Sequence, residues 1–175
     1  MPVCEVKVVD GDGVAQAPVA VGEIWIKGPN VVRGYWGKPE ATAESFSDGW
    51  LHSGDIGRVD SEGFVYILDR AKDMLIRGGE NVYCVEVEDA LYGHPGVMDA
   101  AVIGRPHHIL GEEVVAVVQA APGATVDEAA LIAHCRAHIA PFKVPVMVQI
   151  RTEPLPRNAN GKILKPQLKR ELFGA

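Results

Sequence analysis

Long apolar runs are absent from this 175-residue sequence. The longest unbroken apolar runs have about five residues, as in Val114–Val118, whereas a membrane-spanning helix needs roughly twenty, so no such helix is predicted. Met1–Glu5 contains no basic region followed by an apolar stretch, so we expect no signal peptide. Cysteine is also scarce, because only Cys4, Cys84 and Cys135 occur, odd in number and far apart. This usage favours a reducing compartment and predicts a cytoplasmic protein.

Signatures of self-contained catalysis are missing as well. The sequence has no G-x-S-x-G elbow, no phosphate loop of the G-x-x-x-x-G-K-[S/T] type and no G-x-G-x-x-G loop. It therefore gives no support for an esterase or a nucleoside triphosphatase that acts alone. His134 and His138 lie four residues apart with Cys135 between them, but no H-E-x-x-H pattern marks them, so no metal site is expected.

Charge is unevenly distributed in a composition that is otherwise typical of globular proteins. Apolar residues make up 47% and charged residues 23%, which excludes a disordered tail, a coiled-coil rod and a collagen-like fibre. The net charge of −6 resides in residues 1–69, whereas residues 151–175 carry +4. No aromatic residues interleave with this basic end, so a nucleic-acid surface is not expected. A solvated terminal helix or a site for a small anion remain as interpretations.

The first third of the chain predicts short strands. Residues 3–10 and 23–27 alternate between apolar and polar side chains, and residues 57–68 have the pattern of a hairpin with a turn at 60–63. One helical turn is expected at 39–45. These strands are expected to form part of a β-barrel or sandwich.

The pattern changes at about residue 69, where we place a domain boundary. Residues 85–92 form an amphipathic helix pattern, and Asp127 is a suitable N-cap for a second helix. Pro166 is suited to the first turn of a closing helix. The strands expected in this part lie at 97–103, 114–119 and 146–151. The order helix–strand–strand–helix–strand–helix predicts a small α+β domain with a three-stranded sheet flanked by helices.

Three segments hold residues suited to binding sugars or anions. Asp55, between glycines, can accept two hydrogen bonds from a vicinal diol, although a plain Asx-turn explains the segment equally simply. Arg70 can bind oxygen atoms through its planar guanidinium group, and Gly78-Gly79 allows a ligand to approach the backbone. The alternative interpretation of this segment is a hairpin with a solvated charge cluster. Lys162 follows a tight-turn signal and is either an exposed turn lysine or a mobile point charge for phosphate or carboxylate.

Four segments, in this order and at this spacing, closely resemble the adenylate-forming superfamily, which comprises acyl-CoA synthetases, carrier-loading adenylation domains and beetle luciferases. The segments are GEIWIKGPNVVRGYW, GWLHSGDIG, LDRAKDMLIRGGENVYCVEVE and LPRNANGKILK. The resemblance covers nearly the whole chain. It implies that the chain is the C-terminal portion of such an enzyme, since the family's phosphate-binding loop and most of its acyl pocket lie upstream of anything here.

The resemblance also implies a domain organisation and a reaction. Residues 1–69 would be the distal end of the large N-terminal domain, in its β-barrel part, and residues 70–175 would be the mobile C-terminal domain. The family uses ATP and Mg²⁺ to join a carboxylic acid to AMP, and a thiol such as that of CoA then displaces AMP. The ligands of Mg²⁺ are expected upstream, as is the missing N-terminal domain, so the chain alone is expected to be inactive.

By the same resemblance, each candidate residue receives a role. Asp55 would hold the ribose hydroxyls of the adenylate, and Arg70 would contact the nucleotide. Lys72 would be the hinge on which the small domain rotates. Lys162 would be the catalytic lysine of adenylation, and Gly78 and Gly79 would line the tunnel for the pantetheine arm of CoA.

The segment IRGGENVY resembles the fatty-acyl and medium-chain CoA ligase branch more than the luciferases. Two positions depart from that pattern: Cys84 stands where many relatives have proline, and Asn81 stands where some CoA ligases carry arginine. The leading interpretation is therefore part of an ATP-dependent CoA ligase, with fatty acids as the expected substrates. Two alternatives stay open, a piece of a carrier-loading adenylation domain and a non-catalytic module that binds a nucleotide or a partner.

Overall fold

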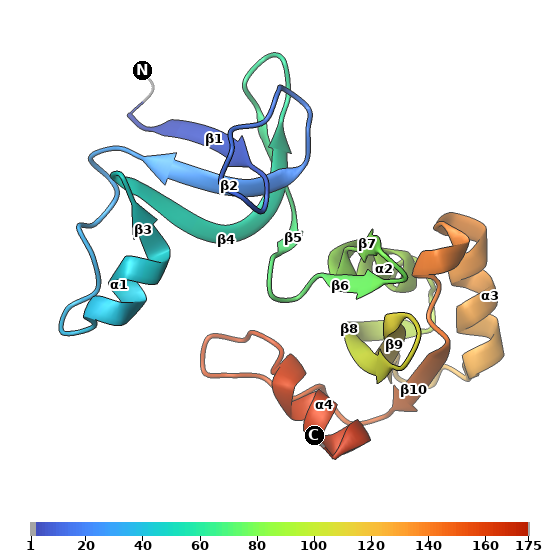
Figure 1. Ribbon diagram of the computed structural model, residues 1–175. Helices are drawn as coiled ribbons and strands as arrows, with labels where there is room; N and C mark the ends of the chain where they lie inside the picture. Colours follow the sequence, from blue (N-terminus) through green and yellow to red (C-terminus); the bar gives the residue numbers. More distant parts are fainter. Residues whose placement is uncertain (1–2, 175) are drawn as a thin grey trace. The chain divides into compact units, whose positions relative to one another are not determined.

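A computed structural model describes residues 3–174 of the chain (Figure 1). The chain divides into two compact units, Met1–Lys72 and Asp73–Ala175. The division lies three residues after the boundary expected at residue 69. Each unit has its own sheet and is described separately below.

The first unit is an antiparallel sheet with one short helix. Its elements are β1 (Glu5–Val9), β2 (Gly22–Lys27), α1 (Pro39–Ser45), β3 (Phe46–Ser47), β4 (Trp50–Val59) and β5 (Val65–Arg70). The strand order is β1-β2-β4-β3, and β5 pairs with the second half of β4. Register shifts interrupt the pairing of β4 with both β2 and β5, and β-bulges of this kind bend a strand. Figure 1 shows β4 as a long, curved strand that connects the whole unit.

The strands and the helix predicted for this unit are present, but β3 and the first part of β4, Trp50 to Ile56, were not predicted. The short helix begins at Pro39, as expected of a residue that suits the first helical turn. The segment around Asp55, however, is the middle of β4 and not an Asx-turn. Cross-strand pairing on both sides of β4 outweighs the local turn preference of its glycines.

The second unit is the α+β fold predicted from the sequence. Its elements are β6 (Leu75–Arg77), β7 (Glu80–Val82), α2 (Cys84–Tyr92), β8 (Val97–His107), β9 (Gly111–Ala120), α3 (Glu128–His138), the 3₁₀ turn η1 (Pro141–Lys143), β10 (Met147–Arg151) and α4 (Lys165–Phe173). Asp127 caps α3, since its side chain accepts the Ala130 N–H at 2.8 Å. Pro166 lies in the first turn of α4.

The sheet of this unit has five strands, which corrects the expected three. The predicted strands are present as β8, β9 and β10, and the short β6–β7 hairpin adds two more, in the order β10-β9-β6-β7 with β8 on β9. Strands of three residues, such as Leu75–Arg77, are too short to give a visible alternating pattern. β10 runs parallel to β9 because α3 carries the chain back across the sheet.

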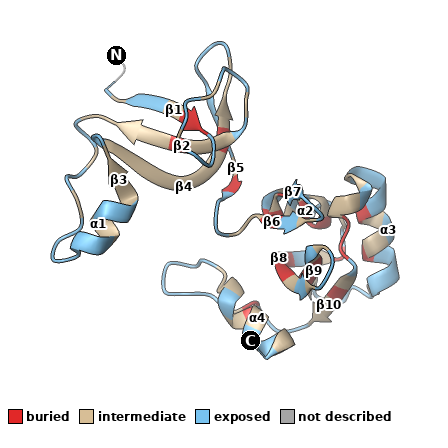
Figure 2. Ribbon diagram, in the orientation of Figure 1, coloured by how far each residue is buried: buried red, intermediate tan, exposed pale blue. Residues whose placement is uncertain are grey.

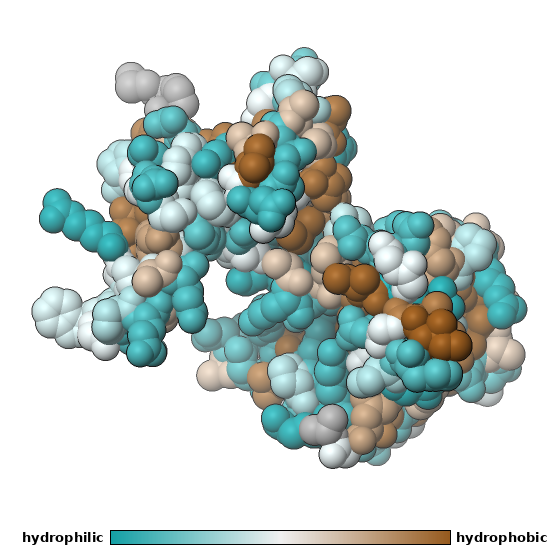
Figure 3. All heavy atoms as spheres, in the orientation of Figure 1, coloured by the Kyte–Doolittle hydropathy of each residue, from teal (hydrophilic) through white to brown (hydrophobic). Residues whose placement is uncertain are grey.

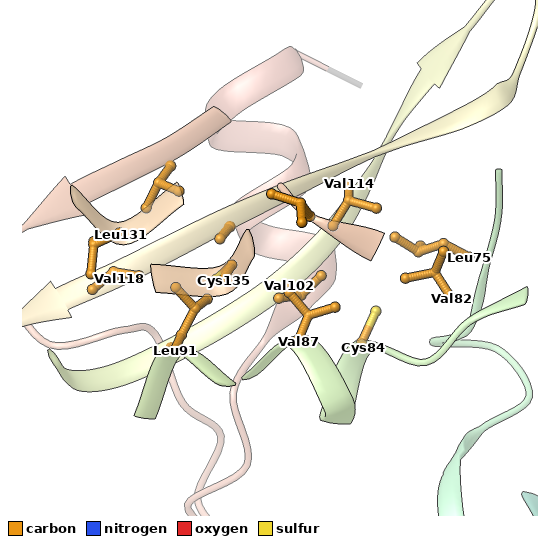
Figure 4. Close-up of a cluster of buried hydrophobic side chains, with 14 residues drawn as sticks. Leu75, Val82, Cys84, Val87, Leu91, Val102, Val114, Val118, Leu131 and Cys135 are labelled. Carbon is orange, nitrogen blue, oxygen red and sulfur yellow. The ribbon is translucent and has the colours of Figure 1, made fainter. Parts of the chain in front are cut away.

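Apolar residues cover both faces of this sheet. On one face, side chains of α2 and α3 form a buried cluster with side chains of the strands (Figure 4). The cluster includes Leu75, Val82, Cys84, Val87, Leu91, Val102, Val114, Val118, Leu131 and Cys135. On the other, Leu168 of α4 packs against Ala101, Ile103, Val115, Val117 and Leu155. Successive residues of β8 and β9 serve alternate faces, which explains the unbroken apolar run at Val114–Val118. Figure 2 shows the buried residues concentrated in these strands.

No helix among residues 3–174 is long and apolar enough to cross a membrane.

Candidate functional site

Asp55 and Arg70 face each other across the β4–β5 strand pair. They are register partners, and Arg70 Nε donates to Asp55 Oδ1 at 2.9 Å. The Arg70 side chain is 44% exposed and that of Asp55 is 32% exposed, so both reach solvent. A carboxylate can accept two hydroxyl groups and a guanidinium can bind phosphate with its remaining N–H groups. The structure thus brings together two of the residues singled out from the sequence.

Glu23 on β2 supports this strand pair, and sequence reasoning missed it. Its Oε1 accepts the Gly54 N–H at 2.9 Å, and its Oε2 accepts Trp25 Nε1–H at 2.9 Å. Gly54 directly precedes Asp55, so Glu23 fixes the backbone that carries the carboxylate. An alternating strand such as GEIWIK contains no local signal for this role.

Lys72 lies at the end of the first unit. It is exposed, and the preceding residue, Ala71, donates its N–H to the Gly54 carbonyl at 2.8 Å. The division between the two units falls directly after Lys72. The hinge role expected of Lys72 stays a prediction.

Gly78 and Gly79 form the turn between β6 and β7. Their φ angles are +61° and +86°, the combination found in two-residue hairpin turns of type I′. The Gly78 N–H donates to the Leu110 carbonyl at 2.8 Å, and a Cβ at Gly78 would lie 3.3 Å from the Leu110 side chain. A Cβ at Gly79 would meet nothing within 4 Å. The hairpin is confirmed, and the tunnel role stays a prediction.

Lys162 follows a tightly hydrogen-bonded turn. Asn158 Oδ1 accepts the N–H groups of Asn160 and Lys162 at 3.0 and 2.9 Å, and the Asn158 N–H donates to the Lys162 carbonyl at 2.9 Å. Hydrogen bonds within residues 158–162 thereby order the backbone around Lys162. Its side chain is exposed, and within the described part of its own unit it forms no ion pair. The ammonium is available for a ligand.

An ion pair holds the chain just after this turn. Lys165 Nζ lies 2.7 Å from Glu88 Oε1, and the same oxygen accepts the Val102 N–H at 2.8 Å. Burial disfavours the ammonium, but the Cys84 sulfur and the Glu88 carboxylate outweigh this effect and raise the pKa of Lys165. Lys165 therefore stays charged and fixes the start of α4 against α2 and β8.

The histidines of α3 are structural. His134 Nε2 lies 3.0 Å from the Ala90 carbonyl of α2, and its ring lies 4.3 Å from that of His138. Burial, followed by the charge of His138, lowers the pKa of His134 below its ordinary value. Among the residues described, no group of three or more His, Cys, Asp and Glu side chains could hold a metal ion.

Comparison with known proteins gives a consistent result. Residues 86–162 match the family described as AMP-binding enzyme C-terminal domain. A feruloyl-CoA synthase of Amycolatopsis sp is 48% identical over 170 residues, which are 97% of this chain and 34% of that protein. A long-chain-fatty-acid–CoA ligase of Bacillus subtilis is 48% identical over 159 residues, which are 91% and 28% of the two lengths. The structure of o-succinylbenzoate CoA synthetase from Bacillus subtilis, in complex with an acyl-adenylate, superposes with a TM-score of 0.89 at 40% identity, over 97% of this chain and 34% of that one.

The chain belongs to the AMP-binding, adenylate-forming enzyme family. The resemblance identified from the four sequence segments is confirmed, as is the α+β fold. The chain spans about a third of the length of the curated relatives that it matches.

The candidate residues of the chain are divided between its two units. Asp55 and Arg70 lie in the first, whereas Gly78-Gly79 and Lys162 lie in the second. Arg157, at the start of the Lys162 turn, makes contacts that sequence reasoning did not anticipate. Its sequence signals are its place in the basic C-terminal end and in the segment LPRNANGKILK.

Proposed function

We propose that the chain is part of an ATP-dependent ligase that joins a carboxylic acid to CoA. The acid first reacts with ATP to give an acyl-adenylate and pyrophosphate, and the CoA thiol then displaces AMP to give a thioester. The observation that carries this proposal is the exposed Lys162 ammonium, which an ordered turn presents and no carboxylate of its described unit neutralises. The names of the relatives, which are CoA synthases and ligases, support it.

In the adenylate, Asp55 accepts hydrogen bonds from the ribose hydroxyls and Arg70 binds the nucleotide. The Arg70–Asp55 contact orients the carboxylate and occupies only one of its oxygens, so the other can accept a hydroxyl. Neutralisation by Arg70 also keeps the carboxylate from repelling the phosphates.

Lys162 serves the first step. When the carboxylate attacks the α-phosphate, negative charge accumulates on oxygens that lie close together. A positioned ammonium stabilises this charge, and such electrostatic stabilisation is commonly the largest single contribution to catalysis. The turn sets the place of the ammonium before the reaction begins.

The Gly78-Gly79 turn serves the second step. Rotation at Lys72 withdraws Lys162 and brings the turn to the passage of the pantetheine arm. Glycines suit such a wall because side chains would narrow the passage. The open space around Gly79 within its own unit is compatible with this use.

A fatty acid is our proposed substrate, on the basis of the IRGGENVY segment. The names of the two relatives cited above specify different acids, so an assay with each class of acid tests this choice. Residues of the missing N-terminal domain are our proposed ligands of Mg²⁺, since among residues 3–174 no group of three or more His, Cys, Asp and Glu side chains could hold a metal ion. A cytoplasmic location also remains a prediction.

The proposal is tested with a fusion in which this chain replaces the matching third of the Amycolatopsis feruloyl-CoA synthase. With ferulate, ATP, Mg²⁺ and CoA, we expect AMP and feruloyl-CoA at a rate within about tenfold of the parent enzyme, since catalytic residues are retained. A folded fusion that forms neither product contradicts the proposal. Replacement of CoA by a phosphopantetheinylated carrier protein tests the carrier-loading alternative, which predicts that the carrier is the better acceptor.

A further inference from the structure

Arg157 connects the Lys162 turn to the central sheet of the second unit. Its Nη2 forms an ion pair with Asp99 Oδ2 on β8, and its Nη1 donates to the Gly161 carbonyl, one residue before Lys162. One guanidinium therefore binds a sheet carboxylate and the backbone of the turn at the same time. The planar fork of arginine makes such double binding possible, whereas a lysine ammonium offers no fixed geometry.

Asp99 is a well-fixed anchor for this contact. Its side chain is only 11% exposed, and Oδ1 accepts Tyr92 O–H at 2.6 Å and the Ala100 N–H at 3.1 Å. A register shift next to Met98 marks a β-bulge, a feature that changes the direction of side chains on a strand. Burial and the hydrogen bond to Asp99 raise the pKa of the Tyr92 phenol, so Tyr92 remains a donor at neutral pH.

We propose that Arg157 and Asp99 are positioning residues that fix the location of the Lys162 ammonium. This inference rests on the role of Lys162 given under the proposed function. Gly161, with φ of +79°, could adopt many orientations if its carbonyl were unbound. The Arg157 N–H selects one of them and thereby sets the direction in which the Lys162 side chain leaves the backbone. Because Asp99 is a buried residue of β8 in the sheet of the second unit, this contact connects the turn to that sheet.

The first test measures amide hydrogen exchange in the 175-residue chain and needs no activity. In Arg157→Ala, the N–H groups of Gly161 and Lys162 should exchange at least about tenfold faster, because the turn opens more often. The matched control is Arg151→Ala, which removes the Arg151–Glu171 ion pair of 2.8 Å in the same unit without touching the turn. We expect a change below about twofold in the control. Equal responses of the two variants overturn the proposal.

The second test uses the fusion and separates positioning from general stability. Arg157→Ala should lower kcat for adenylation about tenfold or more while changing KM for ATP less than about threefold, since a misplaced group acts mainly in the transition state. Arg157→Lys should not restore the rate. In a Lys162→Ala background, Arg157→Ala should have no further effect, because the group that it positions is gone.

If Arg157→Ala lowers kcat for adenylation by the same factor in the presence and in the absence of Lys162, Arg157 has a purely structural role and the inference is overturned. A double-mutant cycle of Asp99→Asn and Arg157→Ala should give non-additive losses of kcat for adenylation, since both residues act through one contact. Additive losses would contradict the inference. If Lys162→Ala itself leaves adenylation intact, the proposed function fails, and the exchange measurement still decides whether Arg157 orders the turn.

Discussion

At the scale of single residues, Lys162 combines an exposed charge with an ordered backbone. In the fusion, Lys162→Ala should slow adenylation about a hundredfold, or cost about 3 kcal/mol of transition-state stabilisation, because one positioned donor for the developing charge is lost. Pyrophosphate exchange measures this step. Thioester formation from synthetic acyl-adenylate and CoA should be largely spared.

Lys169→Ala is the matched control, since Lys169 is another lysine of the C-terminal part, with a side chain that is 40% exposed and an Nζ that lies 4.0 Å from Glu112 Oε1. It should leave both half-reactions within about twofold, as expected for a surface ion pair. Equal losses of the two half-reactions in Lys162→Ala would mean that Lys162 is structural.

The lowered pKa of His134 predicts that the folded chain loses stability on acidification. Its pKa in the folded chain lies below the ordinary value of 6.5, so the unfolded chain takes up a proton first as the pH falls. The free energy of unfolding should therefore decrease from about pH 6.5 downward and stop decreasing below the folded pKa. Urea unfolding between pH 8 and pH 5 measures this. Glu113 and Glu171, whose pKa values are lowered from 4.5, contribute stability that is lost only in a more acidic range.

The variant His134→Gln should flatten this pH dependence, since glutamine can still donate to the Ala90 carbonyl but does not titrate. His108→Gln, in the exposed loop between β8 and β9, should leave the profile of the parent chain nearly unchanged. An unaltered profile in His134→Gln would exclude His134 as its origin.

At the scale of the elements, the β6–β7 hairpin presents the Gly78-Gly79 turn. Gly79→Leu should reduce thioester formation about a hundredfold or more, because the added side chain enters the proposed path of the pantetheine arm. Pyrophosphate exchange should change only a few fold, since Lys162 lies on a different element. Because Gly79 has a φ of +86°, leucine also costs roughly 1–2 kcal/mol of backbone strain.

Gly79→Asn separates strain from obstruction, because asparagine tolerates a positive φ better than leucine while still adding bulk. It too should affect thioester formation more than pyrophosphate exchange. If Gly79→Asn loses both half-reactions together, or Gly79→Leu leaves thioester formation intact, the tunnel role is wrong.

The elements also mark where sequence reasoning succeeded and where it could not. Long helices with clear caps, such as α3 after Asp127, and strands of continuous apolar character were predictable because their signals are local. The β6–β7 hairpin joins the sheet through a single register pair, Arg77 with Gly111, which no local pattern encodes. The Asp55–Arg70 pair was foreseen as two separate residues, whereas the supporting Glu23 lies 31 residues from Gly54 and could be found only by strand pairing.

At the scale of the whole molecule, the candidate residues belong to two compact units of a chain that spans about a third of its relatives. We expect the 175-residue chain alone to be inactive, since the family's phosphate-binding loop and most of its acyl pocket are not among the segments that it contains. Incubation with ATP, Mg²⁺, CoA and a panel of fatty acids should yield no AMP above background. Robust turnover would contradict our assignment of the chain as only part of the ligase.

The edge of the first sheet has a consequence for the behaviour of the protein in solution. Within the described residues β5 pairs only with β4, and Phe64, Val65, Tyr66 and Ile67 are consecutive exposed apolar residues without charge. In Figure 3, brown apolar patches interrupt a surface that is otherwise mostly hydrophilic. An uncharged segment of high β-propensity at an open strand edge can act as a template for a second copy.

Concentrated solutions of the isolated chain should therefore form oligomers that grow by strand addition, with a mass that rises with concentration in sedimentation experiments. Ile67→Lys should restore the monomer, because a charge on an edge strand opposes this pairing. Ile109→Lys, which changes an equally apolar and 76% exposed residue in a loop, should not. A single lysine on β5 is then the change expected to turn an aggregating preparation into one suited to crystallisation or spectroscopy.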